Sequence, residues 1–396
     1  MRDDFPFFAA NHNTIYLDSA ATSQTLKSVI DDTRDFLTHR RANAHRSGHS
    51  MGTWINNEYH RAKEYIGAWL NIDQPDKRII FNSGTTQGLH DAATMIQQIM
   101  SPGGVVFIGR DSHHSLILPF TQSGNAKWRI VFIDLDSQGR IDLNDLRQKI
   151  ALQPMGVNKV IAVTAVSNVL GVVNDIAGIN KIAHEVAAVS MLDASQIIGK
   201  GSVNLTGWDF VAWSWHKVYG PMGLGCLLVD PVWLNFDPVR PGGGSVTHVG
   251  LDTAVYLEDA GRFESGTQNL AGIAAIPNLV SWLSQHQTAI EFHDTAMAQL
   301  AYSHVNKNKF TPVSEPDSGL ISLKPTVGTA EDYAMFLDAR NVMVRTGKLC
   351  AEPLVTALGS DGLIRISWAA YTTAAEIEQT FDHLEDIYDR ISRIAQ

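Results

Sequence analysis

Lys217 directly follows a strongly apolar stretch of the chain. Residues 208–215 are nearly all apolar, which predicts a strand covered on both faces. Ligands of open α/β sheets bind at the carboxyl edge of the strands, and Gly220, Gly223 and Gly225 would allow close backbone approach beside the lysine. Lys217 is therefore either a candidate for a Schiff base with a carbonyl compound or a solvated loop residue.

Two further apolar runs end in polar side chains. Residues 186–192 stop at Asp193, with Gln196 three positions on, and residues 159–166 are followed by Ser167 and Asn168. A carboxylate at 193 could keep a pyridine nitrogen protonated, which turns the ring of pyridoxal phosphate (PLP) into an electron sink. The alternatives are that Asp193 caps a helix and that Asn168 makes a turn instead of reaching the phenolic oxygen of the cofactor.

A phosphate site is predicted where residues 78–81, a short strand, lead into Gly84, Thr85 and Thr86. A helical pattern of apolar residues continues from there to residue 99. This turn presents free N–H groups, two hydroxyls and the positive end of the helix dipole to an anion. Ser and Thr also cap ordinary helices. Neither a Walker lysine nor a GxGxxG motif follows a strand here.

Composition narrows the class of protein. A chain of 396 residues exceeds the usual single core, and 44% apolar residues can fill two. The net charge of −10, without a Lys/Arg cluster among aromatics, argues against nucleic-acid binding. No apolar run is long enough for a bilayer and the first residues lack the basic start of a secretory signal, so we expect no membrane and a cytoplasmic location.

The order of elements predicts an α/β fold with a mostly parallel sheet. Strands alternate with helical segments from about residue 24 to residue 280. A long helix over 272–305 leads to a smaller α+β part with strands at 319–323, 342–345 and 363–368, and helices at 330–339 and near the C-terminus. The C-terminal helix has Thr373 and Glu376 at capping-box spacing. We expect a large domain over 21–285 and a small one from 1–20 and 286–396.

The two cysteines have different surroundings. They are too few for a disulfide framework or a Cys-rich metal site, and no metal is expected. Cys226 lies in an apolar strand and is expected to be an inert core residue. Cys350 lies in a polar, turn-rich loop, where Arg345 and Lys348 would favour the thiolate. It is either a nucleophile or a structural cysteine.

Several segments carry a resemblance over essentially the whole chain. They are residues 16–22 (YLDSAAT), 81–86 (FNSGTT), 167–171 (SNVLG), 193–196 (DASQ) and 214–221 (SWHKVYGP). They resemble cysteine desulfurases, which belong to the class V aminotransferase group of fold type I PLP enzymes. Residues 263–269 (FESGTQN) and 345–354 (RTGKLCAEPL) are similar to the SufS/CsdA type, with its short cysteine loop.

The resemblance implies a reaction and a set of roles. L-Cysteine would become L-alanine while its sulfur passes to Cys350 as a persulfide, for delivery to a SufE-like acceptor in sulfur mobilisation such as Fe–S cluster assembly. The implied catalytic residues are Lys217, Cys350 and His113, which would stack on the ring. The other implied cofactor ligands are Thr85, Thr86, Asn168, Asp193, Gln196, Ser214, His216 and, from the second subunit of a homodimer, Thr267. The implied substrate ligands are Arg345, Arg365 and Asn168.

Three positions depart from the family pattern. Ser112 stands where the family usually has Glu before its His-His pair, Gln268 replaces a Pro, and Lys348-Leu349 replaces the His-His often found before the nucleophile. The last two lie on the substrate or dimer side of the expected site. Rival functions are therefore a selenocysteine lyase, a C–S β-lyase, an epimerase or an aminotransferase with Cys350 idle, or a non-enzymatic scaffold.

Overall fold

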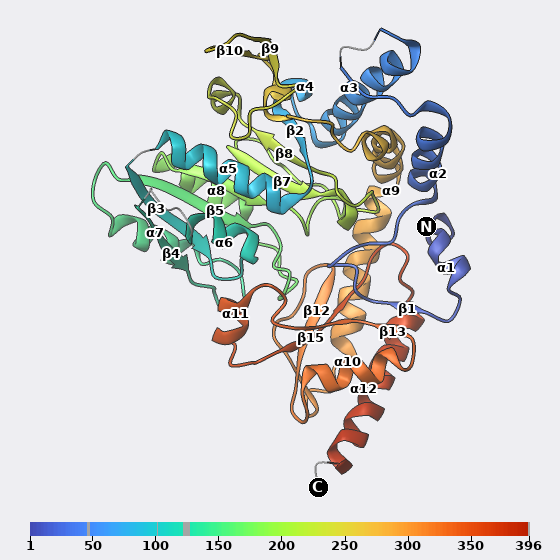
Figure 1. Cartoon of the computed structure of the whole chain (residues 1–396). Coiled ribbons are helices and arrows are strands. Elements are labelled where there is room, and N and C mark those ends of the chain that lie inside the picture. The colour runs from blue at the N-terminus through green and yellow to red at the C-terminus, as the bar shows by residue number, and fades with distance from the viewer. Residues whose placement is uncertain (46–47, 101, 122–126, 395–396) are drawn as a thin grey trace.

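The computed structural model describes residues 1–45, 48–100, 102–121 and 127–394. A seven-stranded sheet in the order β2-β8-β7-β6-β5-β3-β4 lies at the centre of its larger part (Figure 1). Its strands are β2 (Ile79–Asn82), β3 (Gly103–Gly109), β4 (Lys127–Ile133), β5 (Asn158–Thr164), β6 (Val189–Asp193), β7 (Phe210–Ser214) and β8 (Gly225–Val229). Only β8 runs antiparallel to its neighbours in this sheet, so the expected mostly parallel sheet is confirmed.

Alternate residues of the strands fill two separate apolar layers. In β3, Phe107 packs with the layer of α3, α7, α8 and α9, whereas Val106 and Ile108 pack with α5 and α6 on the other face. Burial on both faces explains why these strands read as continuous apolar runs. The helices around this sheet are α2 (Lys27–Asp35), α3 (Ser50–Leu70), α4 (Pro75–Arg78), α5 (Thr85–Ile99), α6 (His114–Thr121), α7 (Leu143–Ala151), α8 (Ile176–Glu185) and α9 (Leu270–Ser303).

A second, antiparallel sheet of four strands in the order β11-β12-β15-β14 lies below the first in Figure 1. Its strands are β11 (Phe310–Pro312), β12 (Leu320–Pro325), β14 (Arg345–Gly347) and β15 (Leu363–Ser367). The prediction of a single strand over 342–345 is wrong. This segment contributes to two strands, because β13 (Val342–Met343) pairs with β1 (Ile15–Tyr16) while β14 pairs with β15.

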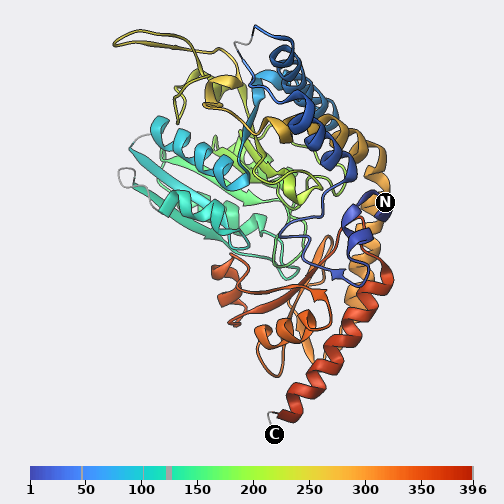
Figure 2. The same cartoon turned by 45° about the vertical axis from the view of Figure 1, so that its right-hand side comes forward.

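Helix α9 runs from the large sheet past the small one, and α12 (Ala374–Ile394) packs beside it (Figure 2). The expected capping box of α12 is confirmed, since the Glu376 carboxylate accepts from the backbone N–H of Thr373 at 2.8 Å and the Glu376 N–H donates to the Thr373 hydroxyl at 3.3 Å. The remaining helices are α1 (Pro6–Ala10), α10 (Ala330–Asp338) and α11 (Glu352–Ala357). None of the described helices has both the length and the hydropathy to cross a membrane.

The proposed domain boundary at residue 285 falls inside α9. At the other end of the chain, Phe5 and Phe8 pack in the apolar layer of the large sheet, whereas Ile15 and Leu17 pack with the small one. The N-terminal segment thus contacts both cores. The division into 21–285 and 1–20 with 286–396 stays a prediction.

Candidate active site

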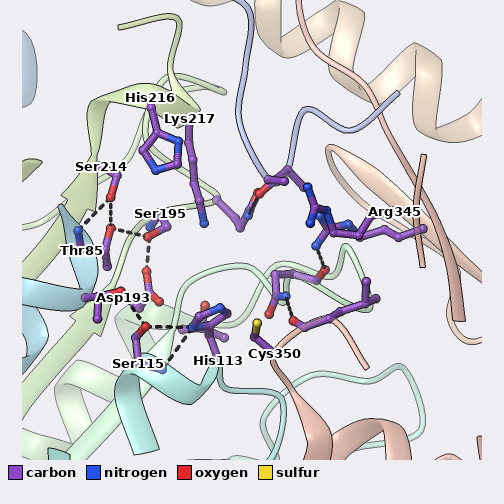
Figure 3. Close-up of a pocket in the computed structure, with 18 residues that line it drawn as sticks. Thr85, His113, Ser115, Asp193, Ser195, Ser214, His216, Lys217, Arg345 and Cys350 are labelled. Atoms are coloured by element: carbon purple, nitrogen blue, oxygen red, sulfur yellow. Dashed lines mark hydrogen bonds between the residues drawn. The ribbon is translucent and has the colours of Figure 1, made fainter. Parts of the chain in front are cut away.

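The carboxyl ends of three neighbouring strands form one wall of a cavity of about 280 Å³ between the two sheets (Figure 3). In register, Thr164 of β5 pairs with Asp193 of β6, and Asp193 pairs with Ala212 of β7. The predicted residues that line the cavity are Thr85, Thr86, His113, Asn168, Asp193, Gln196, Ser214, His216, Lys217, Arg345, Cys350 and Arg365. Thr267 is the one predicted site residue that does not line it.

Hydroxyl groups cluster where α5 begins. The Thr85 hydroxyl lies 2.7 Å from both the Ser195 and the Ser214 hydroxyls, and the Thr85 N–H donates to Ser214 Oγ at 2.8 Å. A Cβ on Gly225 would stand 2.5 Å from the Cα of Gly84, so only glycine lets β8 pass this turn. The arrangement offers hydroxyls and the first N–H groups of a helix to an anion.

Sequence reasoning missed two of these hydroxyl residues. Ser195 lies in the segment 193–196 between the predicted ligands Asp193 and Gln196. This position in the sequence could have indicated it as a site residue. Ser115 hydrogen-bonds both the Thr86 hydroxyl at 2.8 Å and the His113 ring at 3.0 Å. Its only signal was its place two residues after His113.

Both histidines in the cavity are neutral at physiological pH. Burial lowers the pKa of His113 to about 4, and burial and the neighbouring Lys217 lower the pKa of His216 to about 4. The Nδ1 of His113 accepts the Ser115 N–H at 3.1 Å, which places its proton on Nε2. A flat, neutral imidazole suits stacking on a ring, and a neutral His216 can still donate one N–H to a phosphate.

Lys217 projects into the cavity from the short 3-10 turn η3 (Trp215–Lys217) that follows β7. Burial lowers the pKa of its amine, and the cations Arg365 and Lys200 lower it further, against the opposing effect of Asp193. An amine is nucleophilic only when unprotonated, so this environment activates Lys217. Asp193 is buried at the end of β6, and one of its carboxylate oxygens accepts the Ser195 N–H at 2.9 Å.

Two arginines enter the cavity from the small sheet and share one carboxylate. Asp18 accepts from Arg345 Nη2 at 2.6 Å and from Arg365 Nη2 at 3.4 Å. Arg365 is buried, its Nη1 donates to the backbone oxygen of Asn168 at 3.0 Å, and its Nε has no hydrogen-bond partner among the described residues. A buried guanidinium with a free N–H is suited to a carboxylate ligand. Asp18 was not predicted as part of the site, although it lies in the segment 16–22.

Gln196 and Asn168 make contacts that the sequence did not indicate. The Gln196 amide donates to the backbone oxygen of Ala20 at 2.8 Å, which ties the N-terminal segment to the cavity. The Asn168 amide donates to the backbone oxygen of Leu349 at 2.8 Å. Each side chain amide keeps a second N–H, so the predicted cofactor contacts remain open to both.

The two cysteines differ in exposure. Cys350 is exposed and lines the cavity, whereas Cys226 is buried in β8, where burial raises the pKa of its thiol. The structural assignment of Cys226 is thus confirmed. Two of the departures from the family pattern precede Cys350, and they differ in exposure. Leu349 is buried, whereas Lys348 lies at the surface and pairs with Glu352 at 2.6 Å. The third departure, Ser112, is buried.

Thr267 is exposed in a surface hollow that Gln87 and Arg240 also line. The loop that carries it is anchored by the buried Glu264, which accepts the Phe81 N–H at 2.6 Å. Thr267 does not line the cavity of its own chain.

The cavity meets the chemical requirements of PLP. Hydroxyl and N–H donors at Thr85 and Ser214 fit a phosphate, the buried Asp193 fits a pyridinium nitrogen, and the Lys217 amine fits a carbonyl carbon. The volume is near the lower end of that of small-molecule sites, which are typically about 300 to 1,000 Å³.

The family model "Aminotransferase class-V" matches residues 15–380. Curated relatives named "Probable cysteine desulfurase" include one of Halalkalibacterium halodurans, 32% identical over 94% of this chain and 92% of the relative, and one of Vibrio cholerae, 30% identical over 92% and 91%. Among solved structures, the cysteine desulfurase of Thermococcus onnurineus has a TM-score of 0.91 at 27% identity, covering 98% of this chain and 97% of its own. CsdA of Escherichia coli has a TM-score of 0.89 at 26% identity, covering 98% of each chain.

Proposed function

Because this chain belongs to the aminotransferase class-V family and resembles cysteine desulfurases along nearly its whole length, we propose that it transfers the sulfur of L-cysteine to Cys350 and leaves L-alanine. The observation that carries the proposal is one cavity lined by Lys217, Asp193, a buried arginine and an exposed cysteine. This set serves an amino-acid substrate and a sulfur acceptor together. An aminotransferase or epimerase has no use for the cysteine.

PLP, when bound, would supply an electron sink for the pair released from the substrate Cα–H bond. Thr85, Thr86, Ser214 and His216 would hold its phosphate, Asp193 its pyridinium nitrogen, and His113 would cover its ring. Gln196 and Asn168 would face its phenolic oxygen. The Nζ of Lys217 would first hold the cofactor and then, once displaced by substrate, move the proton of the substrate Cα.

Arg365 and Arg345 position the substrate. Its carboxylate would bind the free Nε of Arg365, while Asp18 keeps the two like charges close together by neutralising one of them. The substrate sulfur would then lie toward Cys350. The thiolate of Cys350 attacks the substrate sulfur and an S–S bond forms. The C–S bond of the substrate breaks, and its electron pair passes to the substrate Cβ. Protonation of that carbon gives alanine, so no external oxidant is needed.

Cys350 is exposed, which supports delivery of its sulfur to an acceptor protein of the SufE kind, for uses such as Fe–S cluster assembly. Both cysteines are free thiols, which suits the reducing cytoplasm. We further propose a homodimer, because Thr267 does not line the cavity of its own chain and the resemblance assigns this residue to the second subunit.

Incubation of the purified protein with L-cysteine tests the reaction. We expect alanine in the supernatant and an intact-protein mass increased by one sulfur atom, located on the Cys350 peptide. Cys350→Ala should lower alanine production by orders of magnitude, since loss of a covalent nucleophile removes a step. Its visible spectrum should stay unchanged, because Lys217 and Asp193 are intact.

Cys226→Ala is the matched control, expected to cost only stability through a small cavity. Wild-type alanine release by Cys350→Ala would overturn the proposal. Pyruvate with free sulfide in place of alanine would identify a β-lyase, and a strong preference for selenocysteine would identify a selenocysteine lyase.

A further inference from the structure

The adjacent histidines 113 and 114 face different parts of the molecule. The His113 ring lines the cavity, whereas His114, the first residue of α6, contacts the loop that carries the nucleophile. The backbone N–H of His114 donates to the backbone oxygen of Cys350 at 2.8 Å, and the backbone N–H of Glu352 donates to the side-chain Nε2 of His114 at 3.1 Å. One residue of the large sheet's outer layer therefore grips both ends of the segment 350–352.

The backbone of this loop is strained. Leu349 and Cys350 are consecutive non-glycine residues with φ of 56° and 53°. Residues with a Cβ rarely adopt this left-handed backbone conformation, and it persists where surrounding contacts stabilise it. Without external contacts we expect the loop to relax toward other conformations.

Two further contacts hold the loop against the large domain. The Leu349 side chain is buried in an apolar cluster with Val169 and Leu354, and its carbonyl oxygen accepts from the Asn168 amide. The surface pair of Lys348 and Glu352 is exposed on both sides and adds little. Of the hydrogen bonds that side chains outside the loop make to it in the described part of the chain, the one with His114 involves a side chain that does not line the cavity.

We propose that His114 is a positioning residue that latches the Cys350 loop against the cavity, and that release of this latch lets Cys350 leave the cavity toward a sulfur acceptor. The Glu352 N–H needs an acceptor, so His114 Nε2 is unprotonated in the latched state and its proton is on Nδ1. The first half of the proposal concerns loop position alone. The second half rests on the proposed desulfurase function.

Limited proteolysis measures the latch without any substrate. Lys348 lies within the loop and is partly exposed, so cleavage by trypsin after Lys348 reports how often the loop opens. Peptide mass spectrometry measures the rate of cleavage after Lys348. In His114→Ala we expect this rate to rise about tenfold, because the loop loses one hydrogen bond that holds it. Alkylation of Cys350 by iodoacetamide should accelerate in parallel, with the buried Cys226 as internal reference.

Two amide variants separate the latch from general loss of structure. Gln reaches about as far as His Nε2 and can accept the Glu352 N–H, so His114→Gln should keep the wild-type cleavage rate. The shorter Asn does not reach, so His114→Asn should behave like Ala. His90→Ala, an exposed histidine on the neighbouring helix α5, is the matched control and should change nothing.

Equal cleavage and alkylation rates in wild type, His114→Gln and His114→Asn would overturn the proposal, even if His114→Ala failed to fold. Absence of persulfide on Cys350 with the expected cleavage pattern would refute the desulfurase function and leave the latch standing.

Discussion

The chemistry of the cavity depends first on the protonation state of single side chains. The surroundings of Lys217 favour its neutral amine, because burial and two nearby cations lower the pKa of this group. His113 and His216 are kept neutral by burial at a pKa of about 4. The protein thus shifts Lys217 toward its unprotonated, nucleophilic form and keeps both histidines as neutral N–H donors at pH 7.

Borohydride reduction should fix the bound cofactor irreversibly to Lys217. The visible absorbance of the purified protein should shift on reduction, and the tryptic peptide containing Lys217 should gain the mass of the reduced cofactor. Lys200, whose charge lowers the pKa of Lys217, is the internal control and should stay unlabelled. Label on any other lysine would show that the assignment of the site is wrong.

Among the elements, one buried amide joins the end of β5 to the segments that follow β3 and β4. Asn174 donates to Asp111 Oδ2 and to the backbone oxygen of Thr164, both at 2.9 Å, and accepts the Ile141 N–H at 2.8 Å. Asp111 is fully buried and its Oδ1 has no partner among the described residues. Burial therefore raises the pKa of Asp111 to about 6. This tie fixes the end of β5 next to Asp193.

The raised pKa makes stability depend on pH. Asp111 binds its proton more tightly in the folded protein than in the unfolded chain, where its pKa is about 3.9. The stabilisation by the protonated form is present below about pH 4 and is lost as the pH rises through about 6. Asp111→Asn stays neutral, so its free energy of unfolding relative to wild type should increase by about 1 to 2 kcal/mol between pH 5 and pH 8.

Urea denaturation of both proteins at the two pH values measures this difference, and the exposed Asp361→Asn is the control. A difference between Asp111→Asn and wild type that does not change with pH would contradict the prediction.

The elements that the sequence predicted well are those whose burial is uniform. Continuous apolar runs predicted β5, β6 and β7, and the polar residue after each run indicated where the strands would end together. What local pattern could not predict were partners brought together only by the tertiary fold. Asp18 lies 327 and 347 positions from the two arginines it joins. The exchange of pairing partners between β13 and β14 likewise depends on where β1 lies, which no local pattern encodes.

At the scale of the whole molecule, two features of the surface favour a second copy. The hairpin of β9 (Val246–Val249) and β10 (Ala254–Tyr256) projects from the large sheet in both views and exposes Val249, Leu251 and Val255 (Figures 1 and 2). An isolated two-stranded hairpin is marginally stable in water, so such apolar side chains are expected to be covered. Thr267, in a loop anchored by Glu264, is also exposed.

Thr267→Ala should weaken cofactor binding although Lys217 of the same chain is intact. Loss of a hydrogen bond to a charged phosphate costs about 1.5 to 3 kcal/mol, which corresponds to about 10- to 100-fold in affinity. Titration of the PLP-free protein with PLP, followed by absorbance, measures the change, and Ser265→Ala in the same loop is the matched control. Sedimentation must show that the variant is still a dimer, and a monomer with full cofactor occupancy would contradict the prediction.

Mixed dimers show whether Thr267 acts across the interface. A chain carrying Lys217→Ala and a chain carrying Thr267→Ala are each deficient alone, the first because it lacks the amine and the second because it lacks the hydroxyl. In a dimer of one of each, the site built on the intact Lys217 receives an intact Thr267 only if that hydroxyl comes from the other subunit. Refolding the two chains together should therefore restore tight PLP binding at one of the two sites of each mixed dimer, and at no site of the two parental dimers. If Thr267 acts within its own chain, no site in the mixed dimer has both groups, and affinity should stay as low as in the Thr267→Ala protein alone.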